Sequence, residues 1–171
     1  MENKLNVSLV IGSWKAYNEN NERALGSNWL DMSDYDSIDE IIEELKKEGF
    51  TDEELEETFI QDCSSDIDVF NDCDNTTIEE AFEFLDKLDK SDYDADTIKA
   101  FVEVEGNLDN IDDYDIYFYP GQTMEDVAYD LMHDTMQIPK HLEPYIDYAA
   151  YARDMSYDGF TEVSNGVIEI R

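Results

Sequence analysis

The chain has 171 residues, of which 45 are Asp or Glu and 11 are Lys or Arg, so its formal net charge is −34 at pH 7. So large a negative charge excludes direct binding to the phosphate backbone of nucleic acid or to anionic lipid, because both would repel the protein. Hydrophobic residues make up 42% of the chain and aromatic residues 12%, whereas disordered acidic tails lack such apolar content. We therefore expect a folded protein whose surface is acidic almost throughout.

Cysteine content and the N-terminal sequence indicate the cellular compartment. The two cysteines, Cys63 and Cys73, are too few for a scaffold held together by disulfides. The apolar run at residues 7–11 is too short for a signal peptide, and no run approaches the roughly 18 apolar residues of a membrane-spanning helix. We expect a cytoplasmic protein with reduced thiols and no membrane contact.

The first part of the chain, residues 1–73, is predicted to be a small α+β unit. Residues 4–11 alternate between apolar and polar side chains, which is typical of a half-buried strand. Residues 18–23 are polar and predict a loop, after which residues 29–32 return as a second strand. A third strand at residues 58–63 would complete a small antiparallel sheet.

One helix is predicted between the second and third of these strands. Ser37 and Glu40 match a capping box, and Gly49 gives a typical helix end. The apolar residues behind the cap recur at helical spacing and form one stripe: Ile38, Ile41, Ile42 and Leu45. Residues 64–75, which are polar and rich in acids and Asn, predict a linker or surface loop.

The middle part, residues 74–106, is predicted to be a helical unit of two antiparallel helices. Thr77 caps the first helix, and the second ends at Gly106. Their expected buried residues are Ile78, Ala81, Phe82, Leu85 and Leu88 in the first helix and Ile98, Phe101 and Val102 in the second. Such a pair of helices is too small to fold alone.

The last part, residues 107–171, is predicted to be an α+β unit that begins with an aromatic strand at residues 116–119. An amphipathic helix follows from Thr123, and Pro144 occupies the first position of a further helix. Asn165-Gly166 lies between two β-rich runs and predicts a hairpin. The sequence thus predicts the α+β class, with three small units in a row.

Carboxylates recur on the outer faces of three predicted helices, about 4.5–6 Å apart along each face. Few of these residues have a Lys partner four positions along the chain, so like-charge repulsion is largely uncompensated. We call this set the acidic ridge and take it as the candidate partner-binding surface: Asp39, Glu40, Glu43, Glu44, Glu79, Glu80, Glu83, Asp86, Glu125, Asp126 and Asp130.

Three interpretations of this charge remain open on the residues alone: a solvated or salt-adapted surface, a store of cations, and a surface that copies another polyanion. At the B-DNA spacing of one charge per ~1.7 Å, the net charge would cover about 58 Å, or roughly 17 base pairs. A compact sphere of this mass cannot present the charges in a line, whereas a row of three small units can.

A calcium loop is the best metal-site candidate. Asp92, Asp94 and Asp96 occupy its first, third and fifth positions, and Glu103 occupies its twelfth. Thr97 stands where the sharp turn of such a loop calls for Gly, which argues against it.

Catalysis has no support in the sequence. His133 and His141 fit no zinc-binding spacing with the two cysteines, and no phosphate-binding or nucleophile motif occurs. We expect no enzymatic activity, no cofactor and no bound metal.

The run of residues 138–155 resembles the ArdA antirestriction proteins, most specifically at residues 145–154, and residues 165–170 are similar to the closing hairpin of that family. The N-terminal half agrees more loosely, through Tyr17-Asn18, Leu25-Gly26, Trp29-Leu30-Asp31 and Gln61-Asp62. The loop between Asn18 and Leu25 departs from the family, because it is longer and lacks a Gly.

The resemblance implies an elongated DNA mimic of three units, carried by mobile elements. It implies a homodimer formed through the C-terminal unit, so that Tyr145, Tyr148 and Tyr151 are candidate interface residues. It also implies that the partner is a type I restriction-modification enzyme whose DNA-binding groove accepts the acidic ridge. Two alternatives stay open: an acidic interaction module that binds another basic DNA-binding protein, and a calcium-binding protein.

Overall fold

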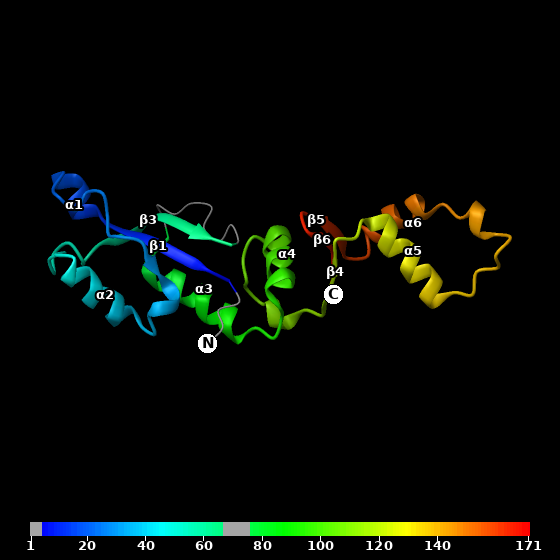
Figure 1. The fold of residues 1–171 in the computed structure, drawn as a ribbon, viewed down its shortest axis with the longest axis horizontal. Coiled ribbons are helices and arrows are strands. Elements are labelled where there is room, and N and C mark those ends of the chain that lie inside the picture. The colour runs from blue at the N-terminus through cyan, green and yellow to red at the C-terminus, as the bar shows by residue number, and fades with distance from the viewer. Residues whose placement is uncertain (1–4, 67–75) are drawn as a thin grey trace. The chain divides into compact units, whose positions relative to one another are not determined.

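The computed structural model describes residues 5–66 and 76–171 (Figure 1). The chain divides into two compact units, Met1–Ser91 and Asp92–Arg171, and each combines helices with a three-stranded antiparallel sheet. The predicted α+β class is therefore confirmed, while the row of three units stays a prediction. Within the described residues, no helix is long and apolar enough to cross a membrane.

The sheet of the first unit has the order β2-β1-β3. It consists of β1 (Val7–Ser13), β2 (Leu30–Asp31) and β3 (Thr58–Ser65), so all three predicted strands are present. β3 carries a bulge opposite Val10 and Ile11. Most of the predicted linker at residues 64–75 lies outside the described residues.

Two helices cover one face of this sheet, and both begin where the sequence predicts. Ser37 caps α2 (Ile38–Lys47), and a complete capping box starts α3 (Ile78–Lys90). A single-turn 3₁₀ helix, Met32–Asp34, precedes α2. The core between the helices and the sheet is formed by aliphatic and aromatic side chains that include Leu9, Ile11, Ile41, Leu45, Phe50, Ile60, Ile78 and Ala81.

The polar segment after β1 is partly helical, so the loop predicted at residues 18–23 is wrong at its first two positions. α1 (Trp14–Glu19) follows the strand directly, because the Ser13 hydroxyl accepts a hydrogen bond from the backbone N–H of Ala16 and caps the helix. The helix ends after one and a half turns, where Asn20 adopts a left-handed conformation.

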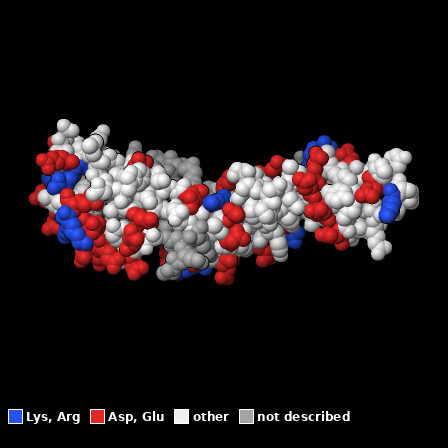
Figure 2. Space-filling model, in the orientation of Figure 1, with Lys and Arg blue, Asp and Glu red and all other residues white. Residues whose placement is uncertain are grey.

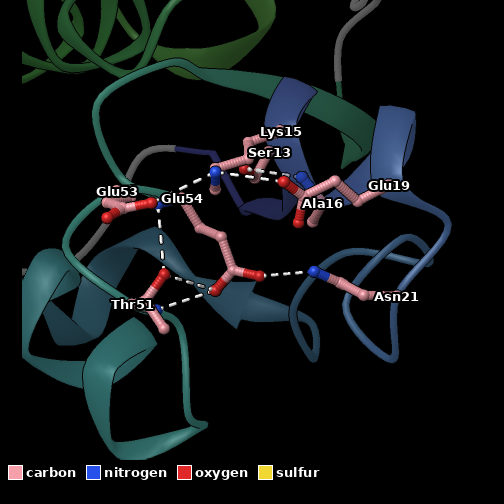
Figure 3. Close-up of polar contacts among 8 residues, drawn as sticks. All are labelled: Ser13, Lys15, Ala16, Glu19, Asn21, Thr51, Glu53 and Glu54. Atoms are coloured by element: carbon pink, nitrogen blue, oxygen red, sulfur yellow. Dashed lines mark hydrogen bonds and ion pairs between the residues drawn. The ribbon is translucent and has the colours of Figure 1, made fainter.

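The long loop after α1 is fastened to the connection between α2 and β3. Glu54 is only 5% exposed, and its carboxylate accepts hydrogen bonds from Asn21 Nδ2 (2.7 Å) and from the backbone N–H and hydroxyl of Thr51 (2.8 and 3.0 Å; Figure 3). Arg23 donates to the carbonyl oxygen of Gly49 (2.5 Å) and lies over the Phe50 ring. These contacts order the segment that departs from the ArdA pattern.

The sheet of the second unit has the order β4-β6-β5, with β4 (Ile116–Pro120), β5 (Phe160–Val163) and β6 (Gly166–Ile170). The hairpin predicted at Asn165-Gly166 is confirmed. The central strand β6 is buried at residues 166–169. Its Glu169 is almost fully buried and pairs with Arg171.

Three α-helices accompany this sheet: α4 (Ala95–Glu105), α5 (Met124–Thr135) and α6 (Tyr148–Met155). α5 and α6 pack together in a core with Phe160 and Val167 of the sheet, while α4 contacts all three strands. Single-turn 3₁₀ helices lie at Ile111–Asp113 and Glu143–Tyr145. Of the two helices predicted for the middle of the chain, α3 packs in the first unit and α4 in the second.

The helix predicted to start at Pro144 starts four residues later. Pro144 lies in the 3₁₀ turn Glu143–Tyr145, and the backbone is extended at Ile146. Asp147 then caps α6 by accepting a hydrogen bond from the N–H of Ala150 (2.9 Å). The capping carboxylate, rather than the proline, determines where this helix begins.

Glu54→Gln tests how much the buried carboxylate stabilises the first unit. We expect a loss of about 2 kcal/mol in the free energy of unfolding at pH 7, since hydrogen bonds to a charged, buried acceptor are lost. The backbone N–H of Thr51 is the main cause of the lowered pKa of Glu54. The stabilisation of the folded protein by the Glu54 carboxylate is thus complete at pH values above 4.5, the ordinary pKa of a Glu side chain. It is lost as the pH falls through the lowered pKa of Glu54.

Urea unfolding of both proteins at several pH values measures this difference, which should shrink on acidification. Glu53→Gln is the matched control, because that neighbouring side chain is exposed and pairs with Lys15 at the surface. Equal stability of Glu54→Gln and the unmodified protein at pH 7 would show that Glu54 does not fasten the loop.

Candidate partner-binding surface

The acidic ridge begins on α2, whose buried side chains fix the direction of its carboxylates. Ile41 and Leu45 are completely buried, so Asp39, Glu40 and Glu43 lie on the exposed side, and Glu44 is half-buried. On this face, Glu40 Oε2 accepts a hydrogen bond from the N–H of Asp36 (2.8 Å), and Glu44 pairs with Lys47 (2.8 Å). Figure 2 shows acidic side chains gathered over the region of α2, with basic ones beside them.

The ridge residues of α3 are all exposed. Glu80 closes the capping box by accepting a hydrogen bond from the N–H of Thr77 (2.8 Å), and Asp86 pairs with Lys90 (2.5 Å). Glu79 and Glu83 share this exposed side of the helix. Ion pairs between exposed side chains contribute little stability and are screened by salt, so they leave most of the repulsion in place.

The third part of the ridge lies on α5 in the second unit, where all three acids are exposed. Asp126 accepts a hydrogen bond from the backbone N–H of Thr123 (3.0 Å), which is the main cause of its lowered pKa. Asp130 accepts from Gln122 Nε2 (3.1 Å). The structure thus exposes the whole predicted set except Glu44, which is half-buried, and divides it between two compact units.

The three candidate interface tyrosines occupy different environments. Tyr145 is 84% exposed and lies before α6, whereas Tyr148 and Tyr151 lie on the helix and are half-buried. Tyr151 packs against the core of the second unit. Of the three, only Tyr145 therefore offers most of its side chain to a partner.

Tyr148 belongs to a polar and aromatic cluster within its own unit. Its ring lies 5.1 Å from that of Tyr129 and 6.0 Å from that of His133, between ring centroids. His133 Nδ1 lies 2.8 Å from the carbonyl oxygen of Tyr129, and Nε2 lies 3.2 Å from Glu143 Oε1. The Tyr129 carbonyl and, next, Glu143 raise the pKa of His133, because both accept hydrogen bonds from the protonated ring.

The residues of the candidate calcium loop have other roles in the structure. Asp94 caps α4 by accepting a hydrogen bond from the N–H of Thr97 (2.9 Å). Glu103 accepts from the N–H and hydroxyl of Ser164 in the β5–β6 turn (2.9 and 2.7 Å). In the part of the chain that is described, no three His, Cys, Asp or Glu side chains are grouped closely enough to hold a metal ion.

The raised pKa of His133 predicts a pH-dependent contact between α5 and the segment before α6. The stabilisation that protonated His133 gives through this contact is complete at pH values below 6.5, the ordinary pKa of a His side chain. It is lost as the pH rises through the raised pKa of His133. We expect Glu143→Gln to lower the pKa of His133 measured by NMR, while Glu125→Gln on the same helix leaves it unchanged. An identical titration curve in all three proteins would contradict the contact with Glu143.

Comparison with known protein families identifies the family of this chain. No curated protein matches the chain. The family described as antirestriction protein (ArdA) matches residues 10–169, which include every ridge helix and most of both sheets. This match covers nearly all the residues that carry the resemblance in the sequence. The chain therefore belongs to the ArdA family of antirestriction proteins.

Proposed function

We propose that this protein mimics B-form DNA and inhibits type I restriction-modification enzymes by occupying their DNA-binding groove. The observation that carries the proposal is the acidic ridge: carboxylates on the exposed sides of three helices, on a chain of net charge −34. The division of the chain into units at residues 1–73, 74–106 and 107–171 belongs to the same proposal, since a row of small units would set carboxylates in a line.

The ridge is supported by a folded scaffold. Each ridge helix buries its opposite side, with Ile41, Ala81 and Val127 all fully buried. Caps at Ser37, Thr77 and Thr123 fix where these helices begin. Carboxylates held in this way lose less conformational freedom on binding than those of a disordered acidic tail.

A groove that binds DNA is lined with Lys and Arg, and these side chains attract carboxylates as they attract phosphates. Binding then releases condensed counterions, so affinity falls as salt rises. Phosphate-like contacts carry no sequence information, because sequence is read from base edges and from DNA shape. An inhibitor built on such contacts should act on enzymes irrespective of their recognition sequence.

We propose that the protein acts as a homodimer that associates through its second unit. Tyr145 is the most exposed of the candidate tyrosines, and Met136 and Leu142 nearby in the sequence are also exposed. Apolar side chains exposed together commonly mark contact with another protein surface. Tyr148 and Tyr151 would support this surface from within the unit.

Neutralising part of the ridge tests the mimicry. Glu79→Gln, Glu83→Gln and Asp86→Asn together remove three charges from α3 and spare its capping box. We expect this variant to compete less well than the unmodified protein with duplex DNA for a purified type I enzyme. The slope of log K for binding to the enzyme against log salt concentration should also be shallower by about 2 to 3. Fluorescence anisotropy with a labelled duplex at several salt concentrations measures both quantities.

A matched control removes three exposed acids that lie outside the ridge, by Asp154→Asn, Asp158→Asn and Glu162→Gln. We expect this control to weaken competition with the duplex less than the ridge variant does. Such a difference would show that the position of the carboxylates matters as well as the net charge. A salt-independent affinity of the unmodified protein, or binding to the enzyme together with DNA, would contradict the mimicry. The second result would favour an acidic interaction module that binds outside the groove.

Tyr145→Asp tests the dimer. We expect this variant to be monomeric at concentrations where the unmodified protein is dimeric, because a charge replaces an aromatic contact in the interface. Sedimentation velocity measures the association. Tyr157→Asp is the control, since Tyr157 is equally exposed in the same unit; dimers of unchanged stability in Tyr145→Asp would exclude Tyr145 from the interface.

A further inference from the structure

The sheet of the first unit has a second face that α2 and α3 do not cover. Leu9, Ile11 and Ile60 point into the core under these helices. The neighbouring residues of β1 are Val10 and Gly12, and strand register sets Gly12 opposite Phe59. Side chains alternate along a strand, so Val10, Gly12 and Phe59 lie on the opposite face.

Gly12 allows aromatic rings to stack on this face. A Cβ atom at Gly12 would lie 2.5 Å from Phe59 Cζ, so the phenyl ring occupies the space of a side chain. The Trp14 ring stacks on Phe59, with 4.2 Å between centroids. Tyr17 packs edge-on against Trp14 at 6.2 Å.

Trp29 extends the same face at the other edge of the sheet. It directly precedes β2, where Leu30 pairs with Leu9 and points into the core. Because side chains alternate along an extended chain, we place Trp29 on the side of the sheet away from Leu30 and the helices. We call Trp14, Tyr17 and Trp29 the aromatic face.

These rings remain open to solvent: Trp14 is 38% exposed, Tyr17 59% and Trp29 52%. They include both tryptophans of the chain. Trp14 and Tyr17 contact each other while both are exposed, and an apolar patch on a surface that is otherwise so strongly charged marks a contact site. Trp and Tyr are also the residues that most often dominate the energy of protein interfaces.

Charge around the aromatic face favours a cationic occupant. Lys15, next to Trp14, is held between Glu19 (3.0 Å) and Glu53 (3.1 Å), as Figure 3 shows. Arg23 is directed toward Gly49 and Phe50 rather than toward this face. Asp62 of β3 lies opposite Val10 in the register of the sheet, and its side chain is exposed. The aromatic face thus combines exposed π-surfaces with an excess of carboxylates.

We infer that the aromatic face binds arginine side chains of the partner's basic DNA-binding groove, by stacking of their guanidinium groups on the indole rings. This inference rests on the proposed function, which supplies a partner rich in basic side chains. Guanidinium groups stack on indole faces better than ammonium groups do, because they are planar and weakly hydrated. Duplex DNA keeps its base faces stacked inside the helix, so this contact adds to those that a phosphate mimic makes.

Variants of Trp29 separate ring stacking from charge and from apolar contact. In competition with a labelled duplex for a purified type I enzyme, we expect Trp29→Ala and Trp29→Leu to weaken binding about tenfold. Trp29→Phe should keep most of the affinity, since it keeps a π-face. The salt dependence should stay that of the unmodified protein, because no charge is lost. Leu25→Ala is the control, as Leu25 is 84% exposed in the same unit but has no ring.

A second measurement uses the unmodified protein, so it does not depend on the folding of any variant. Both tryptophans lie on the aromatic face, and their fluorescence therefore reports on it directly. We expect deca-arginine to change the indole emission at a lower concentration than deca-lysine at the same ionic strength. Trp29→Phe should respond to deca-arginine with a smaller change in emission.

The outcomes distinguish the inference from the function on which it rests. Equal responses to the two peptides, full affinity of Trp29→Leu, or a changed oligomeric state of Trp29→Ala would each overturn the arginine contact while leaving inhibition in place. A protein that does not compete with duplex DNA would overturn the proposed function and the inference together.

Discussion

Repulsion among carboxylates limits how compactly this chain can fold. Net charge far from zero opposes a compact state, and a chain of this size has only small cores to offset that cost. In each unit, helices bury one apolar side against a three-stranded sheet and leave their acidic side chains exposed to water. Where a carboxylate is buried, as at Glu54, hydrogen bonds from neighbouring groups replace water.

The sequence predicted those elements whose signals are local. Capping residues at Ser37, Thr77 and Thr123 located three helices, and Asn165-Gly166 located the hairpin. α1 escaped prediction because six residues are too few to show helical periodicity. The predicted start of α6 was wrong because Pro144 and Asp147, three residues apart, both suit a helix start, and the backbone follows the aspartate.

The candidate site was predictable only in part, for the same reason. Exposure of the ridge acids follows from the apolar stripe of each helix, and the structure agrees. The aromatic face does not follow from local patterns, since Trp14 stacks on Phe59 only because β1 pairs with β3. Tyr145, Tyr148 and Tyr151 share a helical spacing in sequence, yet the helix includes only the last two.

We propose that the protein replaces DNA through contacts that do not read bases. Titration of the protein against two type I enzymes that recognise different sequences, at matched ionic strength, tests this proposal. We expect inhibition constants that agree within about threefold, because the groove contacts are those made to phosphates. Strong inhibition of one enzyme and none of the other would show instead that the protein recognises a feature specific to one partner.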